Sequence, residues 1–324
     1  MPATQGLDLV VGVVGPTATG KSDLAIALAL RLGGEVVGAD ASQLYRGMDI
    51  GTAKVPEAER EGVPHHQIDV LAVTDEASVA AYQRHARADI EAVLARGALP
   101  VVAGGSGLYV RAALDRLEIP PTDPQVRAAL LERLDREGVA ALLAELRDAD
   151  PQAAAAIEPN NGRRVVRALE VIALTGRPFS ATMPTREFVR PTVLVGLRTE
   201  REALDTRIER RTARMFDAGL VDETRGLVDL GLREGRTASR AVGYAQALTV
   251  IDGTSTLEDA VADTALRTRR LVRRQESWFG ADPRVTWFDP FEHGPDDLLE
   301  RVLEHVERAA WSVRRPNRDN EPHG

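Results

Sequence analysis

The sequence of 324 residues contains no cysteine, which excludes disulfide bonds and thiolate zinc sites and is typical of a reducing compartment. No apolar run comes near the roughly 20 residues that a membrane-spanning helix needs. The first apolar run has no basic segment before it and is broken early by Gly15-Pro16, so no signal peptide is expected. We therefore expect a cytoplasmic protein.

The formal net charge of −8 argues at first against nucleic acid as a partner. Local basic patches matter more than the sum, however, because counterion release depends on individual phosphate contacts. Each patch could still be a solvated helix face, neutralised by glutamates such as Glu170 and Glu209. Three patches in one acidic chain nevertheless favour an anionic partner. The arginine clusters are Arg163-Arg164-Arg167, Arg207-Arg210-Arg211-Arg214 and Arg267-Arg269-Arg270-Arg273-Arg274.

The segment Gly15–Ser22 fits the pattern G-x-x-x-x-G-K-[ST], which is typical of nucleotide-binding and ATP-binding loops. An apolar run at 9–14 leads into it and a helix-forming run at 23–30 follows. Glycine lets successive N–H groups turn inward, and the helix start adds its dipole. Lys21 can reach phosphate oxygens, and the Ser22 hydroxyl can coordinate Mg²⁺. The predicted phosphate-binding residues are Gly15, Pro16, Thr17, Ala18, Thr19, Gly20, Lys21 and Ser22.

Short strand-like runs alternate with helical patterns in the first third of the chain. Helical spacing of apolar residues is clearest at 78–96. Such alternation after a glycine-rich phosphate loop predicts an α/β fold of the P-loop NTPase type, with a doubly wound parallel sheet. The expected strands are 9–14, 35–38, 67–70, 99–103, 192–197 and 284–288.

The pattern becomes purely helical, with several prolines, between about Leu114 and Arg190. We therefore assign 1–114 and 191–314 to a core domain with C-terminal helices, and 115–190 to an inserted helical domain. Long helical patterns in the core are expected at 204–230 and 257–278. The polar tail at 315–324 is expected to be disordered.

Three groups outside the phosphate loop could carry chemistry. Asp40 ends the second expected strand, at the edge where α/β sheets bind ligands; it could act as a general base, hold Mg²⁺ through water, or simply cap a turn. Gly104-Gly105-Ser106 follows another strand and offers close backbone approach and a hydroxyl. His65-His66 would point to opposite faces of a strand, so a structural role is expected.

In their order these motifs resemble those of the bacterial tRNA dimethylallyltransferase (isopentenyl-tRNA transferase) family, over nearly all of residues 9–290. Each motif alone is modest, whereas the joint order is specific. Beside the loop, the resemblance is carried by Ala39-Asp40 through Gly51-Thr52-Ala53-Lys54, His65-His66, Gly104–Tyr109, Asp150-Pro151, Pro159-Asn160, Arg167–Val171, Thr175–Pro178, Val242–Tyr244, and Arg274-Gln275 with Trp278.

The resemblance implies transfer of a dimethylallyl group from dimethylallyl diphosphate to the exocyclic amine of adenosine at tRNA position 37, with release of diphosphate. The loop would hold the diphosphate with Mg²⁺, and no nucleotide would be required. The adenosine would be flipped from the anticodon loop into a channel through the protein. The implied partners are the tRNA anticodon stem-loop and dimethylallyl diphosphate, with no membrane and a monomeric chain.

Residue roles follow from the same resemblance. It implies Asp40 as the base, acting with Lys21 and Ser106, and assigns Arg207 and Arg211 to the diphosphate. Ser106 stands where the family usually has threonine. Ala41 replaces a frequent serine, which removes one hydrogen bond. The implied tRNA-binding residues are Asp40, Ala41, Ser42, Gln43, Ser106, Arg127, Arg163, Arg164, Val165, Val166, Arg167, Arg240, Val242, Gly243, Tyr244, Arg273, Arg274, Gln275 and Trp278.

A small-metabolite P-loop kinase is the alternative interpretation, because it would share the loop and the sheet and could use arginines as a lid. It does not explain Gly104–Tyr109, Val242–Tyr244 and Arg274-Gln275 occurring together. ATP turnover would distinguish the two enzymes. A regulatory GTPase module is excluded by the absence of an Asn-Lys-x-Asp element.

Overall fold

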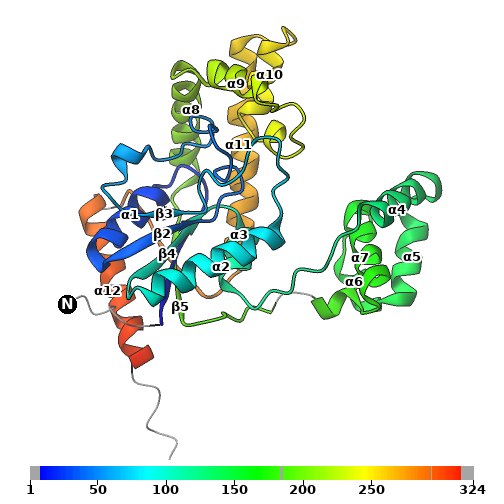
Figure 1. Ribbon diagram of the computed structural model, residues 1–324, viewed down its shortest axis with the longest axis horizontal. Helices are drawn as coiled ribbons and strands as arrows, with labels where there is room; N and C mark the ends of the chain where they lie inside the picture. The colour runs from blue at the N-terminus through cyan, green and yellow to red at the C-terminus, as the bar shows by residue number, and fades with distance from the viewer. Residues whose placement is uncertain (1–7, 183–184, 293, 315–324) are drawn as a thin grey trace, which may run out of the picture. The chain divides into compact units, whose positions relative to one another are not determined.

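The computed structural model describes residues 8–182, 185–292 and 294–314, and the chain divides into two compact units (Figure 1). The first unit contains the chain up to Leu114 and from Phe188 onward, and the second contains Asp115–Glu187. The sequence places the end of the second unit at 190, three residues later. The expected disordered tail at 315–324 lies outside the described residues.

The first unit is built on a six-stranded sheet with the order β3-β2-β4-β1-β5-β6, in which every neighbouring pair is parallel. This confirms the predicted α/β class. The strands are β1 (Val10–Val14), β2 (Gly34–Gly38), β3 (His65–His66), β4 (Leu99–Gly104), β5 (Thr192–Leu197) and β6 (Val285–Phe288). The helices of this unit are α1 (Lys21–Leu32), α2 (Val79–Ala95), α3 (Gly107–Leu114), α8 (Arg201–Asp217), α9 (Leu220–Asp229), α10 (Tyr244–Ile251), α11 (Leu257–Gly280) and α12 (Pro295–Arg314).

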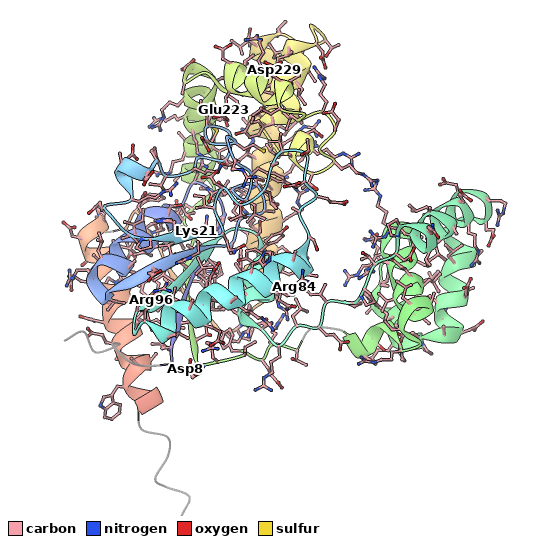
Figure 2. All side chains as sticks on the ribbon, in the orientation of Figure 1. Asp8, Lys21, Arg84, Arg96, Glu223 and Asp229 are labelled. Atoms are coloured by element: carbon pink, nitrogen blue, oxygen red, sulfur yellow. The ribbon has the colours of Figure 1, made fainter. Side chains whose placement is uncertain are left out.

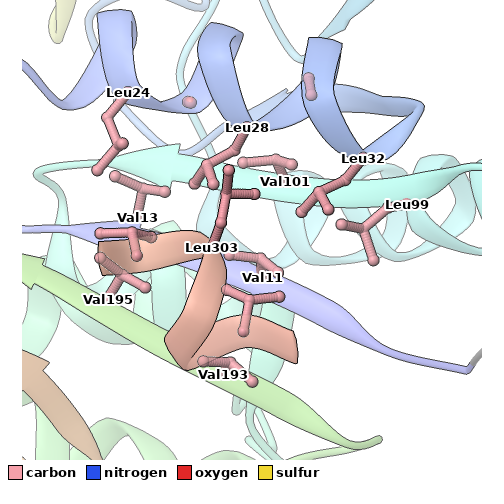
Figure 3. Close-up of a cluster of buried hydrophobic side chains, with 14 of the residues drawn as sticks. Val11, Val13, Leu24, Leu28, Leu32, Leu99, Val101, Val193, Val195 and Leu303 are labelled. Carbon is pink, nitrogen blue, oxygen red and sulfur yellow. The ribbon is translucent and has the colours of Figure 1, made fainter. Parts of the chain in front are cut away.

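Alternate residues of the strands face two helical layers, as the two-residue period of a strand requires. Val11 and Val13 of β1 belong to the core that α1 and α12 cover, where Leu28 and Leu303 are also buried (Figure 3). Gly12 faces the other way, since a Cβ atom there would lie 3.3 Å from Leu114 of α3. The central strands are thus buried on both faces, which is typical of parallel sheets.

Two expected elements were wrong in detail. The third strand is His65–His66 and does not extend over 67–70, because Gln67 and Asp69 adopt φ angles of 56° and 57° that turn the chain out of the sheet. The single helix expected over 204–230 is two helices, α8 and α9, separated at Gly219 with φ 99°. Glycine takes this left-handed conformation without steric cost.

The two adjacent histidines have separate partners. His66 Nε2 lies 2.6 Å from Glu35 Oε2, whereas His65 Nδ1 lies 2.8 Å from the Val63 carbonyl oxygen. Burial lowers the pKa of His65. No cluster of three or more metal-ligating side chains occurs in the described part of the chain. Within the same residues, no helix is both long enough and apolar enough to cross a membrane.

The second unit is a helical bundle of α4 (Pro124–Glu137), α5 (Val139–Ala149), α6 (Pro151–Ala156) and α7 (Gly162–Thr175). The implied RNA contacts at Val165 and Val166 stay predictions, and the structure places both side chains in the bundle. The two valines are 0% and 2% exposed in the core of this bundle. They project from the apolar face of the amphipathic α7, which the other helices cover.

Candidate active site

The loop Gly15–Ser22 has the backbone of a phosphate cradle. Gly15 and Gly20 have φ angles of 137° and 83°, and a Cβ atom on Gly15 would lie 2.3 Å from the Leu197 carbonyl oxygen. Both positions therefore require glycine. The buried Thr19 hydroxyl donates to the Pro16 carbonyl over 2.9 Å. The last two residues of the loop, Lys21 and Ser22, are the first two of α1, so the loop leads into a helix N-terminus, which attracts anions.

Lys21 begins α1, and its side chain reaches back to the start of the loop. Its ammonium donates to the Pro16 carbonyl oxygen over 2.6 Å. Burial, and then the neighbouring positive charge of Arg211, lower the pKa of Lys21 to about 8, although Asp40 acts in the opposite direction. The lysine is thus a poorly solvated cation, and an arriving anion would stabilise its charged form.

Two cavities open on this loop, both within the first unit. The larger has a volume of about 730 Å³ and is lined by the loop, by the segment 49–56 and by four arginines of α8, namely Arg207, Arg210, Arg211 and Arg214. The smaller has a volume of about 450 Å³ and lies between α8, α11 and the segment 236–242. The residues that line both are Thr17, Ala18, Asp40, Thr52, Arg211 and Met215.

Asp40 and Ser106 follow neighbouring strands, β2 and β4, at the same edge of the sheet. Asp40 Oδ1 accepts the Ser42 N–H over 2.9 Å, so the carboxylate does cap a turn. Among the described residues its second oxygen has no hydrogen-bond donor, which leaves that oxygen for a ligand. Ser106 Oγ accepts the Ala41 N–H over 3.3 Å, so its own proton can still be donated.

Gln275 of α11 joins the two glycine-rich turns. Its Oε1 accepts the Thr17 N–H over 2.9 Å and its Nε2 donates to the Gly105 carbonyl oxygen over 3.0 Å. The side chain is buried and also lines the smaller cavity. The structure therefore gives Gln275, an implied RNA contact, a second role, because it holds the phosphate loop against the turn that carries Ser106.

A clasp formed by Glu223 and Tyr244 holds the segment 49–51 that borders both cavities. The Glu223 carboxylate, on α9 (Figure 2), accepts the N–H groups of Asp49 and Ile50 over 3.3 and 2.9 Å. Tyr244 donates to the same carboxylate over 2.6 Å, and its hydroxyl accepts the Gly51 N–H over 3.2 Å. Burial, and then the Glu223 carboxylate, raise the pKa of Tyr244.

Tyr244, an implied RNA contact that stays a prediction, is 0% exposed, and its hydroxyl is held within the clasp. Gly243, also buried, precedes α10 as its cap residue with φ 96°. The start of the clasped segment is also held by Lys54, whose buried ammonium pairs with Asp49 over 2.8 Å and with Asp69. Thr52, which follows this segment, is held by Gln43, whose Nε2 donates to the Thr52 carbonyl oxygen over 3.1 Å.

We expect Tyr244→Phe to lower the free energy of unfolding by about 1–3 kcal/mol, because the partly buried Gly51 N–H and Glu223 carboxylate each lose a partner. Urea unfolding followed by circular dichroism measures the change. Ser255→Ala, which removes a hydroxyl whose hydrogen bond to the Thr256 carbonyl oxygen is exposed, is the control and should stay within about 0.5 kcal/mol of the wild type. An unchanged Tyr244→Phe would mean that the clasp does not hold the loop.

The arginine clusters separate into paired and unpaired members. Buried Glu170 pairs with Arg127 and Arg167 at 2.8 Å each, and Arg167 also donates to the Pro120 and Pro121 carbonyls. These two arginines, implied as RNA contacts, thus neutralise a buried carboxylate. Two arginines of α11 are also paired. Arg269 pairs with Glu209 of α8 at 2.7 Å, and Arg267 pairs with Asp263 of its own helix at 2.6 Å.

Several other implied contacts remain exposed. Among the exposed arginines whose side chains have no hydrogen bond or ion pair within the described residues are Arg163, Arg164, Arg270, Arg273 and Arg274. Trp278 is 45% exposed and lies against the start of α3, where a Cβ atom on Gly107 would be 2.1 Å from its ring. Arg240 and Val242 line the smaller cavity together with Ser42. Arg207 donates to the Ala18 carbonyl over 3.1 Å and stacks on Phe291.

Sequence reasoning missed three contributors to the site. Thr52 lies within a motif quoted for the family resemblance, yet nothing local marks it as a cavity residue. Met215 follows Arg211 by four residues on α8, so the helical period alone could have placed the two on one face. Glu223 has no signal in the sequence, because its role depends on how α9 packs against the segment 49–51.

Comparisons with known proteins identify the family of this chain. The model of the IPP transferase family matches residues 43–282. A tRNA dimethylallyltransferase of Kineococcus radiotolerans is 60% identical over 301 residues, which are 91% of this chain and 95% of that protein. One of Nocardia farcinica is 60% identical over 285 residues, 88% and 91% of the two chains. The crystal structure of a tRNA isopentenylpyrophosphate transferase of Bacillus halodurans superposes with a TM-score of 0.71 at 39% identity, over 95% of this chain and 99% of that one. The chain therefore belongs to the IPP transferase family.

Proposed function

We infer that this protein is a prenyltransferase that modifies tRNA, moving a dimethylallyl group from dimethylallyl diphosphate to the exocyclic amine of an adenosine and releasing diphosphate. Its membership of the family and the names of its relatives support this reaction, and they do not support the kinase alternative. The observation that carries the mechanism is that Asp40 lines both cavities. A donor in one cavity and an acceptor in the other would meet beside its carboxylate.

The diphosphate of the donor binds in the larger cavity. The glycine-rich loop, the start of α1 and three cations line it together: Lys21, Arg207 and Arg211. Charge on the leaving diphosphate grows as the bond from the allylic carbon to oxygen breaks, and preorganised cations stabilise that charge more in the transition state than in the ground state. Arg210 and Arg214 line the same cavity and add to its positive potential.

We propose Mg²⁺ as the cofactor, held by the Ser22 hydroxyl. Ser22 lines the larger cavity with Asp23 and Asp40, and hydroxyl and carboxylate oxygens are the ligands that Mg²⁺ prefers. Mg²⁺ usually keeps water and substrate phosphate oxygens among its ligands, so it needs few from the protein. When bound, it would neutralise charge on the diphosphate.

The acceptor amine enters from the smaller cavity. Ser42, Ser106, Arg240 and Val242 line it and offer hydroxyl groups, a cation and an apolar surface to a flipped base. The amine nitrogen bonds to the allylic carbon as the carbon–oxygen bond breaks. One amine proton then passes to the free oxygen of Asp40, and diphosphate leaves with the electron pair of the broken bond.

The rest of the RNA is expected to lie on the exposed arginines. We propose that the anticodon stem-loop, with adenosine 37 as the target, binds Arg270, Arg273 and Arg274 of α11 and Arg163 and Arg164 of α7. We also propose that the chain is a cytoplasmic monomer, which sedimentation with and without RNA would test.

The reaction is tested by incubating the protein with an adenosine-rich anticodon stem-loop, Mg²⁺ and labelled dimethylallyl diphosphate. Label should appear in the RNA, and digestion should identify it as N6-dimethylallyladenosine at position 37. The same RNA with guanosine at position 37 is the control. Turnover of ATP without transfer to RNA would instead support the kinase.

We expect the combined replacement of Arg270, Arg273 and Arg274 by alanine to weaken RNA binding and to flatten its salt dependence. Each lost phosphate contact reduces the slope of log affinity against log salt by about one. Affinity for the small donor should be unchanged, because none of the three lines a cavity. The measurement is RNA affinity at two salt concentrations. Equal slopes for mutant and wild type would mean that these three arginines do not contact the RNA phosphates, and that Arg163 and Arg164 are the arginines to test next.

A further inference from the structure

The junction between the two cavities offers an inference that rests on the proposed function. In that function the diphosphate lies on one side of the junction and the adenine amine on the other. The five-carbon group that moves between them must therefore occupy the junction itself. The residues that line both cavities define its walls, so one of them contacts this group.

Apolar contact at the junction comes mainly from one side chain. Asp40 and Arg211 are charged, Thr17 and Thr52 are polar, and Ala18 offers a single methyl group. Among the described residues that line both cavities, only Met215 has a long apolar side chain. An apolar tail held among charged groups gains free energy chiefly from such a surface.

The position of Met215 follows from the period of α8. Arg207, Arg211 and Met215 succeed one another at four-residue intervals, so they lie on one face of the helix. Arg207 contacts the phosphate loop at Ala18, over 3.1 Å. This face therefore presents two cations to the diphosphate and then a thioether where the hydrocarbon begins.

Met215 is half-buried and packs against the apolar cluster that contains Tyr45, Phe216 and Leu220. The cluster therefore supports one side of the Met215 side chain, while the side chain also lines the junction. A methionine adapts its shape to an irregular apolar ligand. It also fills space that a longer hydrocarbon chain would need, and a wall behind it prevents it from moving far aside.

We propose that Met215 determines the chain length of the prenyl donor, by closing the junction around a five-carbon allylic group and excluding ten-carbon donors. The chemical step is the same for either donor: the bond from the allylic carbon to the diphosphate oxygen breaks, the bond to the amine nitrogen forms, and the amine proton goes to Asp40. Selection acts on the space available to the tail.

The test compares Met215→Ala with the wild type, using dimethylallyl and geranyl diphosphate and one anticodon stem-loop RNA. We expect the ratio of kcat/KM for geranyl to that for dimethylallyl diphosphate to rise at least about tenfold, the usual size of discrimination by an apolar pocket. Met215→Leu, which keeps the volume, should leave the ratio unchanged. So should Leu230→Ala, at a leucine that is 68% exposed outside both cavities.

A binding measurement separates this proposal from the reaction itself. The dissociation constants of the unreactive thiolodiphosphate analogues of both donors can be measured by calorimetry without RNA, and the Ala variant should gain affinity for the ten-carbon analogue. Unchanged ratios and unchanged affinities would overturn the role of Met215. Failure of the wild type to transfer the dimethylallyl group would instead contradict the proposed function. If Met215→Ala does not fold, Met215→Val is a milder truncation with the same expected direction.

Discussion

Lys21→Ala is expected to lower the rate of dimethylallyl transfer by about 10³-fold, or about 4 kcal/mol of transition-state stabilisation. The Lys21 ammonium begins α1 inside the larger cavity, and its contact with the diphosphate strengthens as the leaving group gains charge. Single-turnover kinetics with saturating donor and RNA measure the chemical step. Arg31→Ala, on the same helix but at an exposed ion pair with Glu300, is the matched control and should react at the wild-type rate.

The same lysine predicts a pH dependence of donor binding. Burial lowers the pKa of Lys21 to about 8, so the free protein loses this positive charge near pH 8, well below the range of an ordinary lysine. Affinity for a diphosphate analogue should therefore fall as the pH rises above about 8. In Lys21→Ala this loss should disappear. Turnover near the wild-type rate in Lys21→Ala would contradict the assignment of the loop to catalysis.

Asp40→Asn is expected to lower the transfer rate by roughly 10² to 10⁴-fold, the usual contribution of a general base. The amide oxygen can still accept the Ser42 N–H that Asp40 Oδ1 accepts over 2.9 Å, so the turn is kept and only the basic oxygen is lost. Affinity for the RNA should stay within a few fold. The measurements are single-turnover rates and RNA dissociation constants for the variant and the wild type.

Asp40→Ala completes this comparison, because it removes both the base and the turn cap. If the Asn variant retains the wild-type rate while the Ala variant loses it, Asp40 is a cap only and the base lies elsewhere. If both lose the rate to a similar extent and both remain folded, the carboxylate is the base.

Local patterns were sufficient wherever short-range physics decides the structure. The loop Gly15–Ser22 could be placed because its two glycines with positive φ angles and the start of α1 all lie within eight residues of the chain. The parallel sheet followed from alternating runs, since buried strands and amphipathic helices are recognisable one by one. Asp40 and Ser106 could be placed at the same sheet edge because each directly follows a strand, and parallel strands end together.

Only the tertiary structure decided which side chains are free to act. Val165, Tyr244 and Arg167 are all candidate RNA contacts in a linear reading, yet the first two are buried and the third neutralises buried Glu170. Burial and pairing depend on contacts between residues far apart in the chain, which no local pattern encodes. The clasp of Glu223 on the segment 49–51, the bridge of Gln275 between two turns, and Met215 at the junction of the cavities exist only because separate helices pack around one sheet edge.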